Sequence, residues 1–251
     1  MTVDKPDKSQ IEKLRLIWRE AFGDTDEFLD TFFETAFSPE RCACIIKDGD
    51  VLASLYWFDC LCRGEKTAYI YAVATAKAYR NKGLCTKLME YTHKKLADCG
   101  YKCVVLVPGE KSLFEFYEKI GYKTFGYIDE KEYRAGDGTI PIERIDKNEY
   151  AKARKKLLPE GGIVQERENL DFLMTQAELY KGDGFVLASR WEKNSLYGIE
   201  FLGDTNIIPH ILNTLGCDCG VIRMPGSSRE FAMYYPLNEG IIPVYFGLAF
   251  D

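Results

Sequence analysis

Apolar positions recur every three or four residues near the start of the chain, and this spacing predicts two amphipathic helices. The first covers residues 10–22, and the second begins at an N-cap provided by Asp24 or Thr25. The apolar side chains of the second helix are Phe28, Leu29, Phe32, Phe33 and Phe37. Both helices therefore have one face suited to covering a sheet.

Apolar runs predict the strands of the first half. They lie at 42–46, 51–61, 66–75, 103–107 and 122–133. Short polar turns separate the first three, which favours an antiparallel meander. A polar loop at 76–82 and a helix from Gly83 to Gly100 separate the next two, and such a crossover makes its flanking strands parallel. A short helix at 112–120 precedes the last strand.

The stretch 135–141 is rich in Gly and ends in Pro, so it is the best candidate for a linker. We therefore expect two domains, 1–135 and 136–251. The elements predicted in the second are helices at 148–158, 168–180 and 205–215 and strands at 185–190, 195–202, 221–224, 230–235 and 244–250. Its strand–helix–strand pattern at 196–224 is a faint echo of the first half.

Composition excludes several classes of function. The net charge is -6 and the sequence pI is about 5.2, and no stripe of Lys and Arg is present, which argues against nucleic-acid binding. No apolar run approaches the roughly 18 residues that a membrane span needs, and the N-terminus lacks the apolar core of a signal peptide. We therefore expect a cytoplasmic protein that binds neither nucleic acid nor membrane.

The chain has nine cysteines. Six of them form three C-x-C pairs, Cys42/Cys44, Cys60/Cys62 and Cys217/Cys219. A zinc site would favour C-x2-C spacing with further ligands, and neither His93 nor His210 has a ligand-like neighbour. We interpret the cysteines as reduced, small apolar residues and expect no metal.

A strand-to-helix loop carries the first chemical signal. It reads Arg80-Asn81-Lys82-Gly83-Leu84-Cys85-Thr86. Backbone N–H groups at a helix start, together with the helix dipole, make a site for an anion such as a pyrophosphate. Gly83 allows a close approach of the backbone, and Arg80 and Lys82 add positive charge. Alone, the same pattern is typical of a solvated helix start.

A second motif, Tyr117-Glu118-Lys119-Ile120-Gly121-Tyr122, follows one strand later. Together the two motifs resemble the GNAT superfamily of N-acetyltransferases, in which R/Q-x-x-G-x-G/A opens the main helix and Tyr-Glu-Lys-x-Gly-Phe/Tyr closes a later one. The resemblance covers about residues 10–130. The chain departs from the family at Cys85, where the family has Gly or Ala, and at Glu110, where it often has Asn.

The resemblance implies an α/β (α+β) GNAT fold, with a mixed central sheet flanked by helices, and acetyl-CoA as co-substrate. Loop 80–86 would bind the pyrophosphate, and the backbone at Val73 and Thr75 would bind the pantetheine and polarise the thioester. An amine would attack the thioester directly, and Tyr117 would protonate the departing thiolate as general acid. The alternative for Tyr117 is packing, because it lies on the same helix face as Leu113.

The stretch Leu106-Val107-Pro108-x-Glu110, and the order of one standard half followed by a degenerate one, resemble the enhanced-intracellular-survival (Eis) branch of this superfamily. In that branch the C-terminal carboxylate is the general base, which implies Asp251 here. The apolar stretch 244–250 suits a buried C-terminus. Residues 1–135 would then be the acyl-CoA-binding domain, and 136–251 a degenerate GNAT half.

Residues 24–34 mix acidic and aromatic side chains in a region that often walls the acceptor site of the family. Such a wall would suit a cationic amine. The pattern favours the alternative, an exposed helix face with acidic residues at its N-terminal end.

Three functions are consistent with these observations. The first is an N-acetyltransferase that acts on a small-molecule or peptide amine. The second is a non-catalytic acyl-CoA-binding module that serves as a sensor or scaffold. The third, an aminoacyl-transferase that uses charged tRNA, is disfavoured by the loop 80–86 and by the acidic pI. Association into a homo-oligomer is left open.

Overall fold

The computed structural model describes residues 1–193 and 195–250. In the N-terminal half, two helices precede the meander and a crossover helix follows it. Its elements are β1 (Thr2–Asp4), α1 (Ile11–Phe22), α2 (Asp26–Thr35), β2 (Cys42–Lys47), β3 (Asp50–Cys62), β4 (Glu65–Thr75), α3 (Leu84–Asp98), β5 (Cys103–Leu106), α4 (Lys111–Lys119) and β6 (Lys123–Arg134). The predicted helices, meander and parallel crossover are confirmed. Thr25, rather than Asp24, accepts the capping hydrogen bond from the Phe28 backbone N–H.

In the C-terminal half, short helices alternate with strands. Its elements are β7 (Glu143–Arg144), α5 (Lys147–Leu157), β8 (Val164–Gln165), α6 (Glu168–Met174), β9 (Glu178–Gly182), β10 (Phe185–Glu192), β11 (Ser195–Leu202), α7 (Ile208–Leu215), β12 (Cys219–Pro225) and β13 (Arg229–Pro236). Around α7, β11 and β12 are parallel neighbours, as the strand–helix–strand pattern predicted.

Two predicted elements are wrong. The helix predicted at 168–180 ends at Met174, because the residues after the following turn pair with β10 as strand β9. The strand predicted at 244–250 makes a single bridge within the described residues, between Tyr245 and Gly162. Val244 is exposed, but the apolar side chains from Tyr245 to Phe250 are buried in the core, so the apolar run reflects burial rather than strand pairing.

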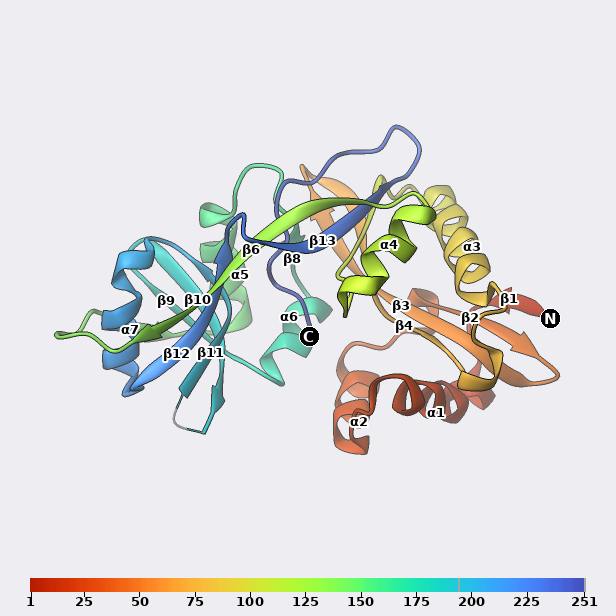
Figure 1. Ribbon diagram of the computed structural model, residues 1–251, viewed down its shortest axis with the longest axis horizontal. Helices are drawn as coiled ribbons and strands as arrows, with labels where there is room; N and C mark the ends of the chain where they lie inside the picture. The colour runs from red at the N-terminus through yellow and green to blue at the C-terminus, as the bar shows by residue number, and fades with distance from the viewer. Residues whose placement is uncertain (194, 251) are drawn as a thin grey trace.

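The described residues form one mixed sheet of 13 strands. The order is β1-β2-β3-β4-β5-β13-β6-β12-β11-β10-β9-β7, and β8 pairs with β3 outside this path. Figure 1 shows α1 and α2 on one face of the N-terminal part of the sheet and α3 and α4 on the other. Alternate residues of β3 serve the two layers, since Tyr56 and Phe58 pack with α1 and α2, and Leu55 and Trp57 with α3.

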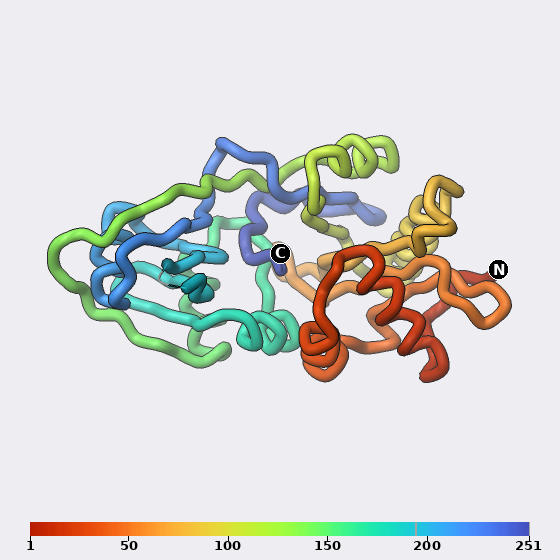
Figure 2. The backbone as a smooth tube through the Cα atoms, turned by 60° about the horizontal axis from the view of Figure 1, so that its bottom comes forward, coloured from red at the N-terminus to blue at the C-terminus, as the bar shows by residue number. Residues whose placement is uncertain are grey.

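The strand β13 joins the two halves. It lies between β5 and β6 and is antiparallel to both, with Met233 opposite Leu106 and Thr124. In Figure 2 the blue chain of β13 runs back from the C-terminal half beside the green chain of β6. Because β6 also pairs with β12, the sheet is continuous across residue 135.

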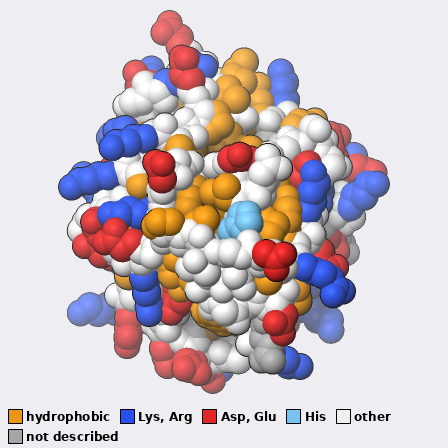
Figure 3. All heavy atoms as spheres, turned by 90° about the vertical axis from the view of Figure 1, so that its left-hand side faces the viewer, with side chains coloured by type: hydrophobic (Ala, Val, Ile, Leu, Met, Phe, Trp, Pro, Cys, Tyr) orange, Lys and Arg blue, Asp and Glu red, His pale blue; other side chains and the backbone are white. Residues whose placement is uncertain are grey.

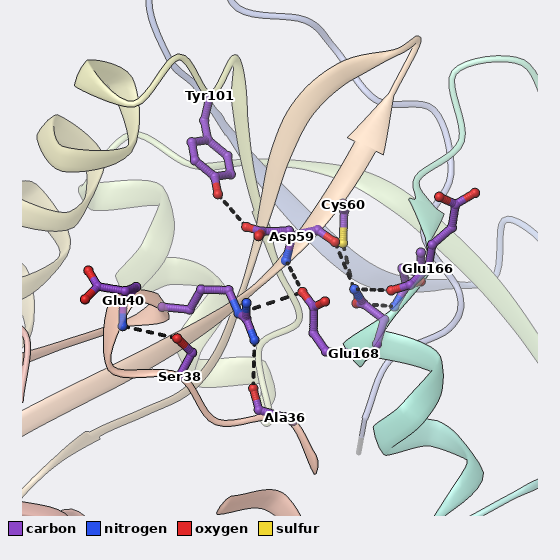
Figure 4. Close-up of polar contacts among 11 residues, drawn as sticks. Ala36, Ser38, Glu40, Asp59, Cys60, Tyr101, Glu166 and Glu168 are labelled. Carbon is purple, nitrogen blue, oxygen red and sulfur yellow. Dashed lines mark hydrogen bonds and ion pairs between the residues drawn. The ribbon is translucent and has the colours of Figure 1, made fainter. Parts of the chain in front are cut away.

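The halves meet a second time along β3, where Figure 4 shows the polar contacts. The Asp59 N–H donates to the Glu168 carboxylate (3.2 Å). The Asn169 side chain on α6 donates to the Asp59 carbonyl (2.9 Å). The next residue, Cys60, pairs with Gln165 of β8. The C-terminal half is therefore hydrogen-bonded to the C-terminal end of β3 as well as to β5.

Charges of both signs cover the end of the C-terminal half. Figure 3 views the left-hand side of Figure 1 and shows basic and acidic side chains interspersed around apolar atoms. This mixing gives the face no field of a single sign. Among the helices described, none is long and apolar enough to cross a membrane.

Candidate active site

A cavity of about 990 Å³ opens where β4 and β5 stop pairing. Their parallel pairing ends at Tyr69 on β4 and Val105 on β5. Beyond it, residues 70–73 of β4 line one wall and residues 106–109 line the other. A gap between two strands exposes backbone polar groups that a complete sheet would use internally, so these groups are available to a ligand.

A bulge in β4 lies on the wall of this cavity. The pairing with β3 shifts between Ser54 and Tyr56, so that Ala72 and Val73 together oppose a single residue. Ala72 has a φ of 49°, a left-handed conformation that is unfavourable for a residue with a side chain. A bulge leaves its extra residue outside the ladder. Ala72 and Val73 thus have backbone groups available at the cavity that they line.

Tyr117 on α4 lines the same cavity. It is 7% exposed and packs edge-on against Tyr122, with the ring centroids 5.5 Å apart. Burial raises the pKa of its hydroxyl well above the ordinary value, and the Cys85 thiol acts in the same direction. The phenol therefore keeps its proton across the physiological pH range. Tyr117 therefore packs in the apolar core and also borders the cavity.

The loop between β4 and α3 contains two left-handed residues, Asn81 with a φ of 60° and Gly83 with a φ of 72°. Gly83 is the N-cap of α3, and the first backbone N–H groups of a helix have no partners within it. A left-handed residue beside a helix start aims neighbouring N–H groups to one side, which suits an anion. Space is available at Gly83, because a Cβ added there would meet no atom within 4 Å.

The basic side chains of this loop donate hydrogen bonds to nearby backbone carbonyls. The Arg80 Nε donates to the Thr75 carbonyl (3.1 Å), and the Lys82 Nζ donates to the Ala78 carbonyl (2.9 Å). The Lys82 ammonium also lies 5.1 Å from the Tyr79 ring centroid. Both charges remain exposed at the loop, so they favour an anion there through their field.

The first turn of α3 connects the loop to the cavity. Leu84 is buried, and the half-buried Cys85 packs in the same apolar cluster as Tyr117. Burial raises the pKa of the Cys85 thiol to about 11, so the thiol is neutral. Thr86 lines a separate cavity of about 590 Å³ beside α3.

The wall of the cavity on the side of α1 and α2 is mainly aromatic. Trp18, Phe22, Asp24 and Phe28 line it there. The Trp18 indole N–H donates to the Asp24 carboxylate (2.7 Å). Of residues 24–34, therefore, Asp24 and Phe28 reach the cavity.

The C-terminal half supplies the remaining wall. Its contributions are Gln176, Arg190, Ser228, Arg229, Glu230, Phe231, Ala249 and Phe250. No sequence motif pointed to Gln176, Arg190 or residues 228–231, because they are distant in the chain from both motifs. Ala249 and Phe250 belong to the apolar stretch 244–250, for which a buried C-terminus was expected. Trp18 was missed for another reason, since it occupies an apolar position of a helix and has the pattern of a core residue.

The structure thus brings Val73 and Tyr117 to one cavity, with the loop 80–86 beside it through Cys85. Thr75 is tied to this loop by Arg80. Asp251 lies outside the described residues. All nine cysteines are free thiols, and the described residues include no group of three or more His, Cys, Asp or Glu that could hold a metal ion.

Comparison with known proteins identifies this architecture. Residues 2–125 match the family model described as the acetyltransferase (GNAT) domain. The N-terminal half is a GNAT domain. A search of curated protein sequences found no significant match.

Solved structures extend the likeness beyond the GNAT domain. A GCN5-related N-acetyltransferase from Kribbella flavida has a TM-score of 0.72 at 14% identity, covering 94% of this chain and 71% of that one. One from Anabaena variabilis has a TM-score of 0.71 at 15% identity, covering 94% and 73%. Eis1 from Mycobacterium abscessus has a TM-score of 0.69 at 9% identity, covering 94% and 73%. The predicted fold class, a GNAT fold followed by a second α/β half as in Eis-like proteins, is confirmed.

Proposed function

We propose that this protein is an N-acetyltransferase that moves an acetyl group from acetyl-CoA to an amine. The observation that carries the proposal is the cavity between β4 and β5. A bulged strand and a buried phenol line this cavity, and a helix start suited to an anion lies beside it, since Cys85 packs in the same cluster as Tyr117. Each of the three features fits a different part of the reaction.

The loop and the strand gap fit the two ends of acetyl-CoA. The N–H groups at Gly83, Leu84 and Cys85 would donate to the pyrophosphate, with the exposed charges of Arg80 and Lys82 nearby. The pantetheine would extend along β4 in the gap beside β5, with its amides bonded to the backbone at residues 73–75 in place of a neighbouring strand.

The bulge and the phenol fit the chemical steps. The amine nitrogen attacks the thioester carbon, which forms the C–N bond and leaves a negative charge on the oxygen. The Val73 N–H would stabilise this oxyanion. Collapse of the intermediate breaks the C–S bond and expels the CoA thiolate, and the Tyr117 hydroxyl would protonate the sulfur.

The amine must lose a proton, because an alkylammonium has a pKa near 10. We propose Asp251 as the group that accepts this proton, since the two residues before it, Ala249 and Phe250, line the cavity. Deletion of Asp251 should then abolish turnover without loss of acetyl-CoA binding. Full turnover by the deletion variant would reject this role.

The acceptor would occupy the aromatic end of the cavity. Asp24 is held there by Trp18, and the neighbouring rings of Phe22 and Phe28 add negatively polarised faces. A carboxylate among aromatic rings favours a cation. The Gln176 Nε2 is buried without a hydrogen-bond partner among the described residues, so it could donate to a polar group of the acceptor.

One assay tests this proposal. Purified protein is incubated with acetyl-CoA and a panel of small-molecule and peptide amines, and free thiol is followed. Tyr117→Phe should lower kcat by about 100-fold or more, because general acid catalysis contributes on that order. Tyr122→Phe is the matched control, since it removes a phenol from the same apolar cluster outside the cavity lining. Equal effects of the two variants would remove the case for Tyr117.

The alternative is an acyl-CoA-binding module without turnover. The substitution of Cys85 for the Gly or Ala of the family motif favours it, because the thiol occupies space at the first turn of α3. Thermal stabilisation by CoA without thiol release for any amine would support this alternative. Absence of stabilisation by any acyl-CoA would argue against both functions.

A further inference from the structure

Residues 244–250, the C-terminal segment, lie along residues 161–165, the docking segment. The Val244 N–H donates to the Gly161 carbonyl (2.9 Å), and the Ile163 N–H donates to the Tyr245 carbonyl (2.8 Å). The Gln165 side chain donates to a third carbonyl, that of Leu248 (2.9 Å). The backbone of the docking segment also pairs with β3 of the GNAT domain, so the docking segment connects the C-terminal segment to that domain.

A buried ion pair holds the same two segments. Glu200 on β11 is 0% exposed and Arg154 on α5 is 2% exposed. The Arg154 Nε and Nη2 donate to the two carboxylate oxygens (2.5 and 2.9 Å), and its Nη1 donates to the Ile163 carbonyl (3.0 Å). The Tyr245 hydroxyl donates to Glu200 (3.1 Å), and so does the Tyr150 hydroxyl (3.4 Å). The pair therefore bonds to the docking segment through Ile163 and to the C-terminal segment through Tyr245.

The C-terminal segment ends at the cavity. The Phe250 N–H donates to the Tyr69 hydroxyl (3.3 Å), and the Phe250 ring packs against Phe58 with centroids 4.8 Å apart. Phe250 also contacts Phe172 of α6, at 5.2 Å. Ala249 and Phe250 line the cavity together with the aromatic wall of α1 and α2.

We infer that Gln165, Tyr245 and the Arg154–Glu200 pair are positioning residues, which fix the C-terminal segment as a wall of the acceptor site. This inference rests on the proposed function. None of these four residues is among the described residues that line the cavity. Their contacts fix Ala249 and Phe250, which line the cavity beside Tyr69, whereas Cys85 of the loop 80–86 packs in the apolar cluster of Tyr117. The C-terminal half therefore sets the affinity for the amine and leaves the affinity for acetyl-CoA unchanged.

Two tyrosine variants test the inference, because each removes one buried hydroxyl from the same carboxylate. Tyr245→Phe alters the C-terminal segment itself. Tyr150→Phe alters α5, which does not reach the cavity. We expect Tyr245→Phe to raise the KM for the amine about fivefold. This factor corresponds to the loss of one hydrogen bond, here the bond from Tyr245 to Glu200. The KM for acetyl-CoA should not change, and Tyr150→Phe should leave both values within about twofold.

Amide hydrogen exchange gives a readout that needs no turnover. In the protein without substrate, the peptide that contains residues 244–250 should exchange faster in Tyr245→Phe and in Gln165→Leu than in Tyr150→Phe. Equal exchange in the three variants would overturn the positioning role even if the protein proves not to be a transferase. Faster amide exchange of residues 244–250 with an unchanged KM for the amine would overturn the role of the C-terminal segment in acceptor binding. Absence of thiol release by the wild-type protein would instead count against the proposed function.

Discussion

The buried pair of Arg154 and Glu200 allows a quantitative test of what holds the C-terminal half together. Burial opposes the charged guanidinium, but the Glu200 carboxylate outweighs it and holds the pKa of Arg154 above its ordinary value. Glu200→Gln keeps the shape of the side chain and removes its charge. The variant leaves a guanidinium that is 2% exposed with neutral partners only. Loss of one partner of a buried pair costs about 3–5 kcal/mol, so the free energy of unfolding should fall by this amount.

Urea denaturation, followed by circular dichroism and tryptophan fluorescence, measures the loss. A folded domain has a stability of about 5–15 kcal/mol, so the variant should remain folded in water with a lower midpoint. Lys13 and Asp50 provide the control, an exposed pair at 2.8 Å with side chains 40% and 71% exposed. Lys13→Gln should lower the stability by less than about 1 kcal/mol.

An equal and small loss of stability in the buried and the exposed variant would show that burial does not decide the energy of the pair. A second comparison separates the charge from the packing. Replacement of both partners, Arg154→Met with Glu200→Leu, should recover most of the stability lost in Glu200→Gln, because no unpaired charge remains buried. A double variant as unstable as the single one would show that the hydrogen bonds to Ile163 and Tyr245 dominate.

Four further outcomes are expected. Asp24→Asn should raise the KM for the amine about tenfold, the effect of losing one hydrogen bond to a charged group. The KM for acetyl-CoA should not change. A rise in both KM values would contradict a role of Asp24 in acceptor binding. Burial lowers the pKa of His93 to about 4 from 6.5, so the unfolded chain binds the proton first on acidification. The free energy of unfolding should therefore fall by about 2 kcal/mol between pH 7 and pH 5, and urea titrations of His93→Phe should lack this part of the slope. Cys85, whose pKa burial raises to about 11, should react with iodoacetamide far more slowly than the exposed Cys99; equal labelling by mass spectrometry would contradict its burial. A chain cut after residue 135 lacks β13 and should show no cooperative thermal transition by circular dichroism, whereas a sharp transition would show that the GNAT domain folds alone.

Local patterns predicted the elements whose partners are close in the sequence. The meander of β2, β3 and β4 and the crossover to β5 were predictable because turns and helix periodicity fix their order. The place of β13 between β5 and β6 was not, because a strand carries no local mark of a partner more than 100 residues away. The stretch 244–250 illustrates the same limit, because an apolar run shows the same sequence pattern whether it forms a buried strand or a buried coil.

The candidate site divides in the same way. The resemblance to the GNAT motifs predicted Val73, Tyr117 and the loop 80–86 as site residues, and Val73 and Tyr117 line one cavity in the structure. The wall formed by Arg229 and Phe231 could not be predicted, because it depends on how β13 of the second half packs onto the first. Trp18 shows a third case, since an aromatic residue on the apolar face of a helix has the same spacing whether it fills a core or borders a cavity.

Two bulges face the cavity, one from each half of the chain. The first, at Ala72 and Val73, interrupts the pairing of β4 with β3. The second lies where the pairing of β13 with β6 shifts between Glu230 and Ala232, and Phe231 between them lines the cavity. A slip of one residue in either strand would turn its cavity-facing side chains to the other face. The strand β13 thus also presents residues to the proposed acceptor site, so folding of the C-terminal half and the proposed recognition of an amine depend on the same register.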